Sequence, residues 1–265
     1  MSPVALITGA SQGSGRAIAQ RFACEGYDLV LAARQADRLD AVAQEVRSLG
    51  RQVVALSTDV SDPSQVQTLV EAAIEQFSRV DVLVNNAGIC LTGSFQDTTL
   101  QDWRSLFDTN LFGYVNTIQA LIPHFLDRGS GAIVNLGSFG GKMPIPMMTA
   151  YCASKYAVTG LTQTLQLELE PHGISVSLVH PGVINSDFLE RAQFRGDVTT
   201  IETSKARLTE TLNANWVSQP EEIAAAVWHA VRDRRSEIVV GPTAIATEAY
   251  RLAPGLVSWA MRSMA

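Results

Sequence analysis

The chain has 265 residues, of which 46% are hydrophobic, so it can bury a sizeable core, and we expect a single domain over residues 1–265. Its formal net charge is −6 and it has no basic block, which argues against nucleic acid as the partner. Cys24, Cys90 and Cys152 have the spacing of neither a metal site nor a disulfide framework, which predicts a reduced, cytoplasmic setting and no metal. No signal segment follows Met1, and no apolar run reaches the roughly 18 residues of a membrane span.

Apolar segments alternate with helical ones along the whole chain. Gly26 and Gly50 are typical of positions just past a helix end, and Pro63 and Pro220 of a first helical turn. This alternation predicts an α/β fold, a Rossmann-type doubly wound parallel sheet of about seven strands with helices on both faces. The strands are expected at residues 3–8, 28–33, 52–58, 80–85, 131–137, 174–179 and 237–241.

A glycine-rich segment follows the first of these strands. It reads Thr8-Gly9-Ala10-Ser11-Gln12-Gly13-Ser14-Gly15, and a helix is expected directly after it at 16–24. Glycines permit a tight turn and a close backbone approach to pyrophosphate, and the helix N-terminus offers free N–H groups. The segment therefore predicts a dinucleotide site; the alternative is a glycine-rich turn that holds no ligand.

A second motif joins Tyr151 and Lys155, which are four residues apart, with Ser138 thirteen residues before the tyrosine. At helical spacing, positions i and i+4 lie on one face, so phenol and ammonium are expected to be neighbours. A phenol has an ordinary pKa of about 10, and a neighbouring cation favours the phenolate and lowers that pKa. The pair therefore predicts acid–base chemistry at Tyr151.

Turn and pair together resemble the single-domain branch of the short-chain dehydrogenase/reductase family. The resemblance extends, in the expected order, over the turn at 8–15, Asp59-Val60, Asn85-Asn86-Ala87-Gly88, the set Asn110, Ser138, Tyr151 and Lys155, and Pro181-Gly182. Ser14 departs from the family, which usually has a branched apolar residue there, and Ser186 stands where the family often has threonine. Besides the turn, the resemblance implies cofactor contacts from Arg34, Arg38, Asp59, Val60, Asn86, Ala87, Gly88, Tyr151, Lys155, Pro181, Gly182, Ile184 and Ser186.

The end of the second strand decides which nicotinamide cofactor fits. An acidic residue there would bind the ribose 2′-hydroxyl, whereas an arginine would accommodate a 2′-phosphate. The chain has Ala33-Arg34 at this point, with no carboxylate, and Arg38 one helical turn later. Because a guanidinium is a planar fork of donors suited to phosphate, we expect NADP (NADPH). The alternative is that Arg34 is a solvated arginine at a strand end.

The resemblance also implies a task for each of four polar residues when hydride is transferred to a carbonyl. Tyr151 donates the proton, and Lys155 lowers the tyrosine pKa and bonds the nicotinamide ribose. Ser138 donates a hydrogen bond to the carbonyl oxygen, and Asn110 anchors a water that relays protons to Lys155. Alternatively, Ser138 makes a local turn and Asn110 bonds the backbone inside a helix.

The substrate pocket is expected to be apolar and adaptable, because thioethers fill irregular shapes. Such a wall favours a small hydrophobic ketone or aldehyde, or the matching alcohol, although Lys142 and Arg191 lie close by in sequence. Alternatively, several of the methionines belong to the core or an interface. The predicted lining is Cys90, Phe139, Gly140, Met143, Pro144, Met147, Met148 and Phe188.

Two segments stand outside this common plan. Residues 185–218 are predicted to form a substrate lid, with a helix from Lys205 to Trp216 that caps the cleft. The tail at 242–265 is predicted to form two short helices separated near Pro254-Gly255. It could pack on the domain or on an oligomer partner, line the cleft, or contact a membrane surface.

The resemblance implies a homodimer or homotetramer formed through the helices at 103–127 and 150–170. Among enzymes, the chief alternative is a 3-oxoacyl-(acyl carrier protein) reductase, for which we expect a basic patch beside the cleft. The non-enzymatic alternatives are an NADP-binding regulatory sensor, which would not need the tyrosine, and a scaffold, which would not need the cofactor turn. The interpretation we adopt is an NADP-dependent carbonyl reductase.

Overall fold

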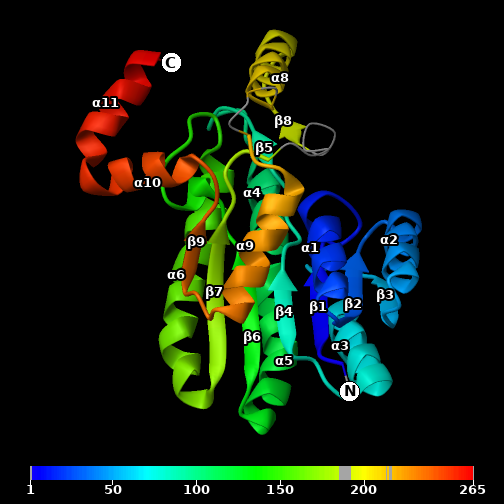
Figure 1. Ribbon diagram of the computed structural model, residues 1–265. Helices are drawn as coiled ribbons and strands as arrows, with labels where there is room; N and C mark the ends of the chain where they lie inside the picture. The colour runs from blue at the N-terminus through cyan, green and yellow to red at the C-terminus, as the bar shows by residue number, and fades with distance from the viewer. Residues whose placement is uncertain (1, 185–191, 213, 215–216, 265) are drawn as a thin grey trace.

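The protein was analysed as a computed structural model, which describes residues 2–184, 192–212, 214 and 217–264. A seven-stranded parallel sheet has the strand order β3-β2-β1-β4-β6-β7-β9, and helices cover both of its faces (Figure 1). The predicted single-domain, doubly wound α/β fold is thereby confirmed. The strands of this sheet are β1 (Val4–Thr8), β2 (Asp28–Ala33), β3 (Val53–Ser57), β4 (Val82–Asn85), β6 (Gly131–Leu136), β7 (Ile174–His180) and β9 (Glu237–Val239).

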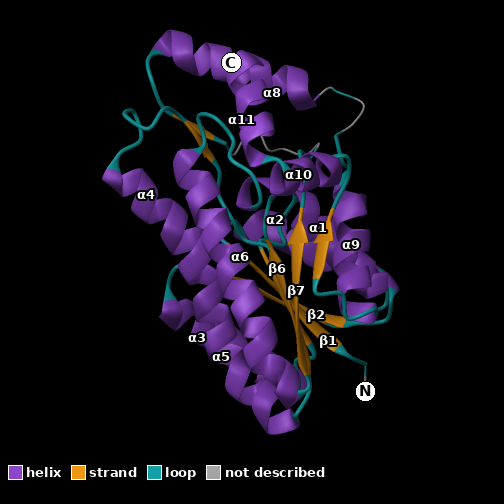
Figure 2. Cartoon of the chain, turned by 90° about the vertical axis from the view of Figure 1, so that its left-hand side faces the viewer, coloured by secondary structure: helices purple, strands orange, loops and turns teal. Residues whose placement is uncertain are grey.

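Two helical layers enclose the sheet, with α1 and α9 on one face and α3, α5 and α6 on the other (Figure 2). The helices are α1 (Gly13–Cys24), α2 (Ala36–Ser48), α3 (Pro63–Phe77), α4 (Leu100–Phe107), α5 (Gly113–Arg128), α6 (Thr149–Leu169), α8 (Val198–Leu212), α9 (Pro220–Arg232), α10 (Thr243–Leu252) and α11 (Pro254–Met264). Shorter pieces are the π-helix η1 (Asp108–Phe112) and the 3-10 turns η2 (Phe139–Gly141) and η3 (Glu170–His172).

Strand β1 shows why the strands are apolar along their whole length. Ala5 and Ile7 belong to the core on the α1 and α9 side, whereas Val4 and Leu6 belong to the core on the α3 and α5 side. Because successive strand residues point to opposite faces, a strand buried on both faces needs apolar residues at every position. The site is thereby confined to the rim where the strands end.

Four buried polar side chains connect this rim to the helices beneath it. The Asn85 amide donates to the Asn135 carbonyl oxygen across β4 and β6 at 3.0 Å. Asn135 in turn donates to Thr162 of α6 at 3.0 Å, and Thr117 of α5 donates to Asn85 at 2.6 Å. Each of these buried groups has a partner, so this chain of hydrogen bonds fixes the positions of β4, β6, α5 and α6 relative to one another.

Sequence periodicity gave no indication of a second, two-stranded parallel sheet that pairs β5 (Leu91–Thr92) with β8 (Gln193–Phe194). Strands of two residues are too short for an alternation pattern to be visible. The small sheet joins the loop after β4 to the chain that leads into α8. It therefore connects the main domain to the predicted lid.

The C-terminal tail forms the two predicted helices, α10 and α11, with the break at Ala253 just before Pro254. Helix α10 packs against η2, whereas α11 projects away from the sheet (red in Figure 1). Leu256 and Trp259 of α11 are exposed. Within the described residues, no helix is both long and apolar enough to cross a membrane.

Candidate functional site

The glycine turn folds so tightly that two of its positions have no room for a side chain. Gly9 has a φ of +67°, and a Cβ added there would lie 2.8 Å from Ala87 Cα. A Cβ on Gly15 would lie only 2.1 Å from the Gly9 carbonyl oxygen. The N-terminus of α1 has no side-chain cap at Gln12. Its first N–H groups are therefore left for a ligand, as pyrophosphate binding requires.

Asn86 and Thr8 hold this turn against the end of β4. The Asn86 amide donates to the carbonyl oxygens of Thr8 and Gly9, at 3.0 and 3.1 Å. In return, Thr8 Oγ1 accepts from the backbone N–H groups of Asn86 and Ala87, at 3.0 and 3.1 Å. The Asn86 side chain, expected to touch cofactor, thus bonds the turn backbone itself and shapes the cradle.

Ser138 and Tyr151 meet on the opposite wall. Ser138 is buried just after β6, and its Oγ accepts from the Gly140 N–H at 3.1 Å. Burial raises the pKa of the Tyr151 phenol well above its ordinary value, and a hydrogen bond with Ser138 offsets part of that rise. Tyr151 therefore holds its proton at neutral pH and can donate it.

Lys155 is buried one helical turn beyond Tyr151, but its ammonium is directed to other partners. Its Nζ donates to the Leu136 carbonyl oxygen at 2.9 Å and lies 5.4 Å from the centroid of the Tyr114 ring. Burial lowers the pKa of Lys155 to about 8. The sequence predicted that Lys155 would lower the tyrosine pKa; in this arrangement the ammonium donates to Leu136 O, and desolvation of the phenol raises the pKa of Tyr151.

Asn110 is fully buried in the π-helix η1, the type of helix insertion that often occurs at functional sites. Its carbonyl oxygen accepts from the Ile89 N–H at 2.8 Å, and its amide donates to Ile89 O and Ser154 Oγ. Asn110 thus bonds the backbone, as its alternative interpretation stated. A Cβ on Gly88 would lie 3.3 Å from Asn110 Oδ1 and 3.8 Å from Lys155 Nζ, so this glycine keeps the space between them free.

One cavity of about 800 Å³ joins the glycine turn to the Ser138 and Tyr151 wall. Its size is that of a typical cofactor or ligand pocket. Of the predicted cofactor residues it is lined by Gly9, Ser11, Gln12, Ser14, Gly15, Arg34, Asp59, Val60, Asn86, Ala87, Gly88, Tyr151, Lys155, Pro181, Gly182 and Ile184. Of the predicted substrate residues it is lined by Cys90, Phe139, Met147 and Met148.

Other predicted residues do not line the cavity: Gly13, Arg38, Asn110, Gly140, Met143 and Pro144. Arg38 instead donates to the Gln12 side chain, and Met143 is buried. Gly140 lies in η2, where its N–H bonds Ser138. Ser186, Phe188 and Arg191 lie outside the described residues.

Several lining residues were not predicted: Ile89, Thr92, Thr109, Ile145, Pro146, Ala192, Gln193, Ser204, Arg207, Leu208 and Thr211. The last four lie on one face of α8, at the spacing of three and four residues that such a face requires. That spacing is readable in the sequence, but only the tertiary structure shows which face of α8 meets the cavity. Arg207 brings a cation to a wall that the sequence predicted to be apolar.

An ion pair lies at the base of α8, in the segment that the sequence predicted to be a lid. Arg195, which directly follows β8, donates to Asp102 of α4 through both Nε and Nη2, the latter at 2.6 Å. The guanidinium beside Asp102 lowers the pKa of that carboxyl to about 2. Asp197 then accepts from the Thr200 N–H at 2.7 Å in the first turn of α8. These contacts fix the start of the helix whose later residues line the cavity.

These features fit a nicotinamide dinucleotide along the cavity. The glycine turn at Gly9 and Gly15 has room for backbone only, so a ligand can approach it closely. The start of α1, which has no side-chain cap, follows this turn, and Arg34 lines the end of the cavity near β2. A parallel sheet that binds a dinucleotide at its carboxyl rim, beside a protonated tyrosine, is the architecture of a nicotinamide-dependent oxidoreductase.

Comparisons with known proteins agree with this assignment to the oxidoreductases. The sequence profile of the short chain dehydrogenase family matches residues 3–195, and the chain belongs to that family. It is therefore an oxidoreductase, as the motifs predicted.

Two relatives show what this chain is similar to. Sulfoacetaldehyde reductase 2 of Chromohalobacter salexigens is 42% identical over 190 residues, which are 71% of this chain and 75% of that protein. The 3-oxoacyl-[acyl-carrier-protein] reductase FabG of Staphylococcus aureus is 36% identical over 244 residues, 92% and 96% of the two chains.

Solved structures with the same fold are also similar to this chain. A short chain dehydrogenase/reductase of Burkholderia phymatum, in complex with NAD, has a TM-score of 0.88 and 29% identity, covering 96% of this chain and 95% of that one. The alcohol dehydrogenase of Thermococcus sibiricus, complexed with 5-hydroxy-NADP, has a TM-score of 0.77 and 29% identity, covering 90% and 96%. Structures similar to this chain thus hold either form of the cofactor.

Replacing Gly15 with alanine is expected to abolish dinucleotide binding, because the new Cβ would lie 2.1 Å from Gly9 O and would force the turn open. The matched control is Gly255→Ala, in α11, where a Cβ would meet nothing within 4 Å. This control should be neutral or more stable by about 0.5–1 kcal/mol. Fluorescence titration measures the NADPH affinity of both variants, and urea unfolding measures their stability. Normal NADPH binding by Gly15→Ala would contradict the assignment of the glycine turn as the dinucleotide site.

Proposed function

We propose that the protein is an NADP(H)-dependent reductase that converts the carbonyl of a small hydrophobic ketone or aldehyde to an alcohol, and catalyses the reverse reaction. The observation that carries this proposal is that Ser138, Tyr151 and Lys155 line the same cavity as the glycine turn. A nucleotide sensor would need the turn but not a proton donor on the facing wall.

When NADPH is bound along the glycine turn, it would supply hydride to the carbonyl carbon. Tyr151 gives its proton to the oxygen as negative charge develops there. The phenol is protonated before the reaction, as a proton donor must be, because burial holds its pKa above the ordinary value. In the reverse direction the phenolate must accept a proton, so alcohol oxidation should be favoured at higher pH.

The neighbours of Tyr151 complete the mechanism. Ser138 Oγ accepts from Gly140 N–H, and the Ser138 hydroxyl, which also bonds the Tyr151 phenol, can donate its proton to the carbonyl oxygen of a substrate. Lys155, whose pKa is lowered to about 8, can exchange protons near neutral pH. The space kept by Gly88 between Asn110 and Lys155 supports the proposed water relay at that point.

The preference for NADP is supported by the end of β2. Arg34 is exposed and lines the cavity, and its carbonyl oxygen accepts from Ser57 Oγ at 3.1 Å, which fixes its backbone. Ala33, before it, offers no carboxylate for a ribose 2′-hydroxyl. Arg38 is held at the glycine turn by Gln12, and its guanidinium adds positive charge on the same side.

A second candidate is a carbonyl substrate that carries an anionic group. It is favoured by Arg207, which lines the cavity beside Ser204 and Thr211. The two relatives named above support it through their names, because sulfoacetaldehyde carries a sulfonate and a 3-oxoacyl carrier protein is a thioester of an acidic protein. The apolar wall of Phe139, Met147 and Met148 favours the hydrophobic substrate.

We also propose that the chain forms a homodimer or homotetramer through α5 and α6. Phe112, at the start of α5, and Leu167, on α6, are exposed. Such large apolar side chains on adjacent helices are typical of an interface between subunits. The segment at 185–218 is proposed as the lid, with α8 as its helix, and α10 packs beside η2 at the edge of the site.

Replacing Tyr151 with phenylalanine is expected to lower kcat for ketone reduction by about 10²- to 10⁴-fold, because the general acid is lost. The Kd for NADPH should change by less than about threefold, since the aromatic ring remains. NADPH oxidation at 340 nm and fluorescence titration measure these two quantities. A variant that keeps substantial turnover would refute the assignment of Tyr151.

Replacing Arg34 with alanine is expected to raise the KM for NADPH by about 10- to 100-fold, because a charge-assisted contact with the 2′-phosphate is lost. The KM for NADH should stay unchanged. The matched control is Arg47→Ala, an exposed arginine in the last turn of α2, which should affect neither cofactor. Equal effects on NADPH and NADH would rule out Arg34 as the residue that selects the cofactor.

The two substrate classes differ in their response to Arg207→Gln. If the substrate is anionic, this change should raise its KM by about 10- to 100-fold and leave neutral ketones unaffected. Lys205→Gln, on the same helix but outside the cavity lining, is the control for loss of charge. A panel of sulfonated aldehydes, 3-oxo acids and neutral ketones checks this; an unchanged KM for every anionic compound would favour the hydrophobic substrate.

A further inference from the structure

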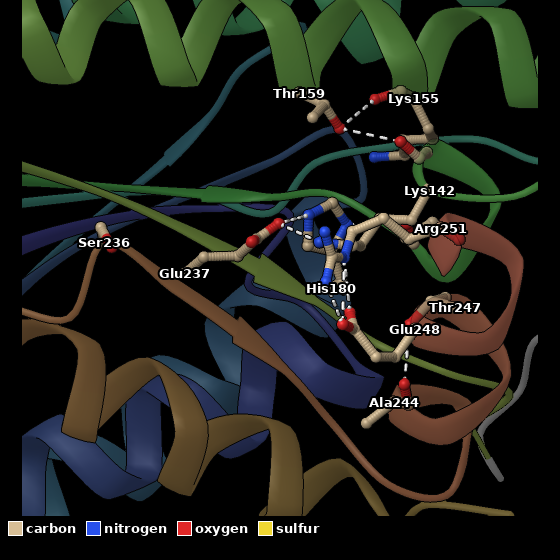
Figure 3. Close-up of polar contacts among 12 residues, drawn as sticks. Lys142, Lys155, Thr159, His180, Ser236, Glu237, Ala244, Thr247, Glu248 and Arg251 are labelled. Atoms are coloured by element: carbon tan, nitrogen blue, oxygen red, sulfur yellow. Dashed lines mark hydrogen bonds and ion pairs between the residues drawn. The ribbon is translucent and has the colours of Figure 1, made fainter. Parts of the chain in front are cut away.

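His180 is a fully buried histidine at the end of β7 that none of the steps above uses. Its Nδ1 lies 2.7 Å from the carbonyl oxygen of Ser138, and its Nε2 lies 2.9 Å from Oε1 of Glu237, the first residue of β9 (Figure 3). The imidazole thus connects the backbone of Ser138 to a carboxylate on the neighbouring strand.

The two partners determine where the protons are. A carbonyl oxygen can only accept, so Nδ1 must carry a proton. Glu237 also accepts from Lys142 Nζ at 2.6 Å, and the His180 and Lys142 contacts lower the pKa of this carboxyl to about 2. An ionised carboxylate accepts as well, so both ring nitrogens of His180 face hydrogen-bond acceptors.

Backbone contacts leave the Ser138 segment little freedom around this ring. Gly137 donates to Val179 O at 2.8 Å and Phe139 donates to Pro181 O at 2.9 Å, so β7 holds the residues on either side of Ser138. A Cβ on Gly137 would lie 2.7 Å from His180 Nδ1, which shows how closely the ring packs there.

Glu237 also holds the far end of the same turn. Lys142, which pairs with Glu237, directly follows η2, the turn that begins after Ser138. One carboxylate oxygen therefore restrains both ends of this short segment, through His180 at Ser138 and directly at Lys142. The charges around the pair are Glu248 and Arg251 of α10, which bond each other (Figure 3).

We propose that His180 and Glu237 are positioning residues for Ser138. The imidazole fixes the Ser138 carbonyl oxygen, and thereby the direction of the hydroxyl on the same residue, while Glu237 fixes the orientation of the ring. This inference rests on the proposed role of Ser138 as the hydrogen-bond donor to the substrate carbonyl.

The test measures the single-turnover rate of NADPH oxidation with a ketone substrate in Glu237→Ala and Glu237→Gln. Glu237→Ala is expected to lower this rate by about 10- to 100-fold through misplacement of Ser138, with the Kd for NADPH changed by less than about twofold. Glu237→Gln should retain most of the rate, because its amide N–H can donate to Nε2 while Nδ1–H stays on Ser138 O. A normal rate in Glu237→Ala, or equal losses in both variants, would overturn the proposal.

Glu248→Gln is the matched control, because it removes a carboxylate of the same cluster that does not contact His180; its rate should be unchanged. Circular dichroism and urea unfolding show whether each variant is folded. The wild-type protein provides a second test that needs no variant. Nitrogen-15 spectra of labelled histidine should show that Nδ1 of His180 carries a proton, as its contact with Ser138 O requires, and an unprotonated Nδ1 would overturn the proposal.

A double-mutant cycle with Ser138→Ala separates this inference from the proposed function. If Glu237 acts only through Ser138, the double variant should be no slower than Ser138→Ala alone. Fully additive losses would overturn the positioning role. A normal rate in Ser138→Ala would instead remove the proposed function of Ser138 and the inference with it, whereas a slow Ser138→Ala with a normal Glu237→Ala overturns the inference alone.

Discussion

The close contact between the end of β1 and the end of β4 is the constraint on which the rest of the site depends. Asn86 donates to two carbonyl oxygens of the glycine turn, and Thr8 accepts from two N–H groups of the chain after β4. The turn can pack this closely against the chain after β4 only because Gly9 and Gly15 lack a Cβ. These contacts place the start of α1 at the sheet rim, and the cavity begins there.

The other wall of the cavity is built by burial as much as by charge. Desolvation keeps the Tyr151 phenol protonated and brings the pKa of Lys155 down to about 8, because a low-dielectric surrounding disfavours the charged form of either group. Buried polar groups there have named partners, among them Asn110 with Ile89 and His180 with Ser138. The polar network is therefore rigid, and rigidity is what places a hydroxyl correctly for catalysis.

The outer part of the cavity is built from shorter and less buried elements than the inner part. There the walls come from β5, β8 and α8, which are short or lie after a long connection. Backbone bonds between β5 and β8 and the ion pair between Arg195 and Asp102 hold them. Elements with few buried apolar contacts are suited to a segment that admits substrate. This part of the cavity combines methionines with Arg207, and the two substrate classes that we propose differ in the same property, charge.

The sequence by itself determined the parallel sheet, the succession of strands and helices along the chain, the glycine turn and the Tyr151 motif. These features depend on apolar periodicity and on local spacing along the chain. Only the tertiary structure decided that Asn86 bonds the turn, that Lys155 is directed to Leu136 O, that Met143 is buried away from the cavity, and that Arg207 faces it. Such contacts join residues far apart in sequence, and the direction of a side chain is set by its packing partners.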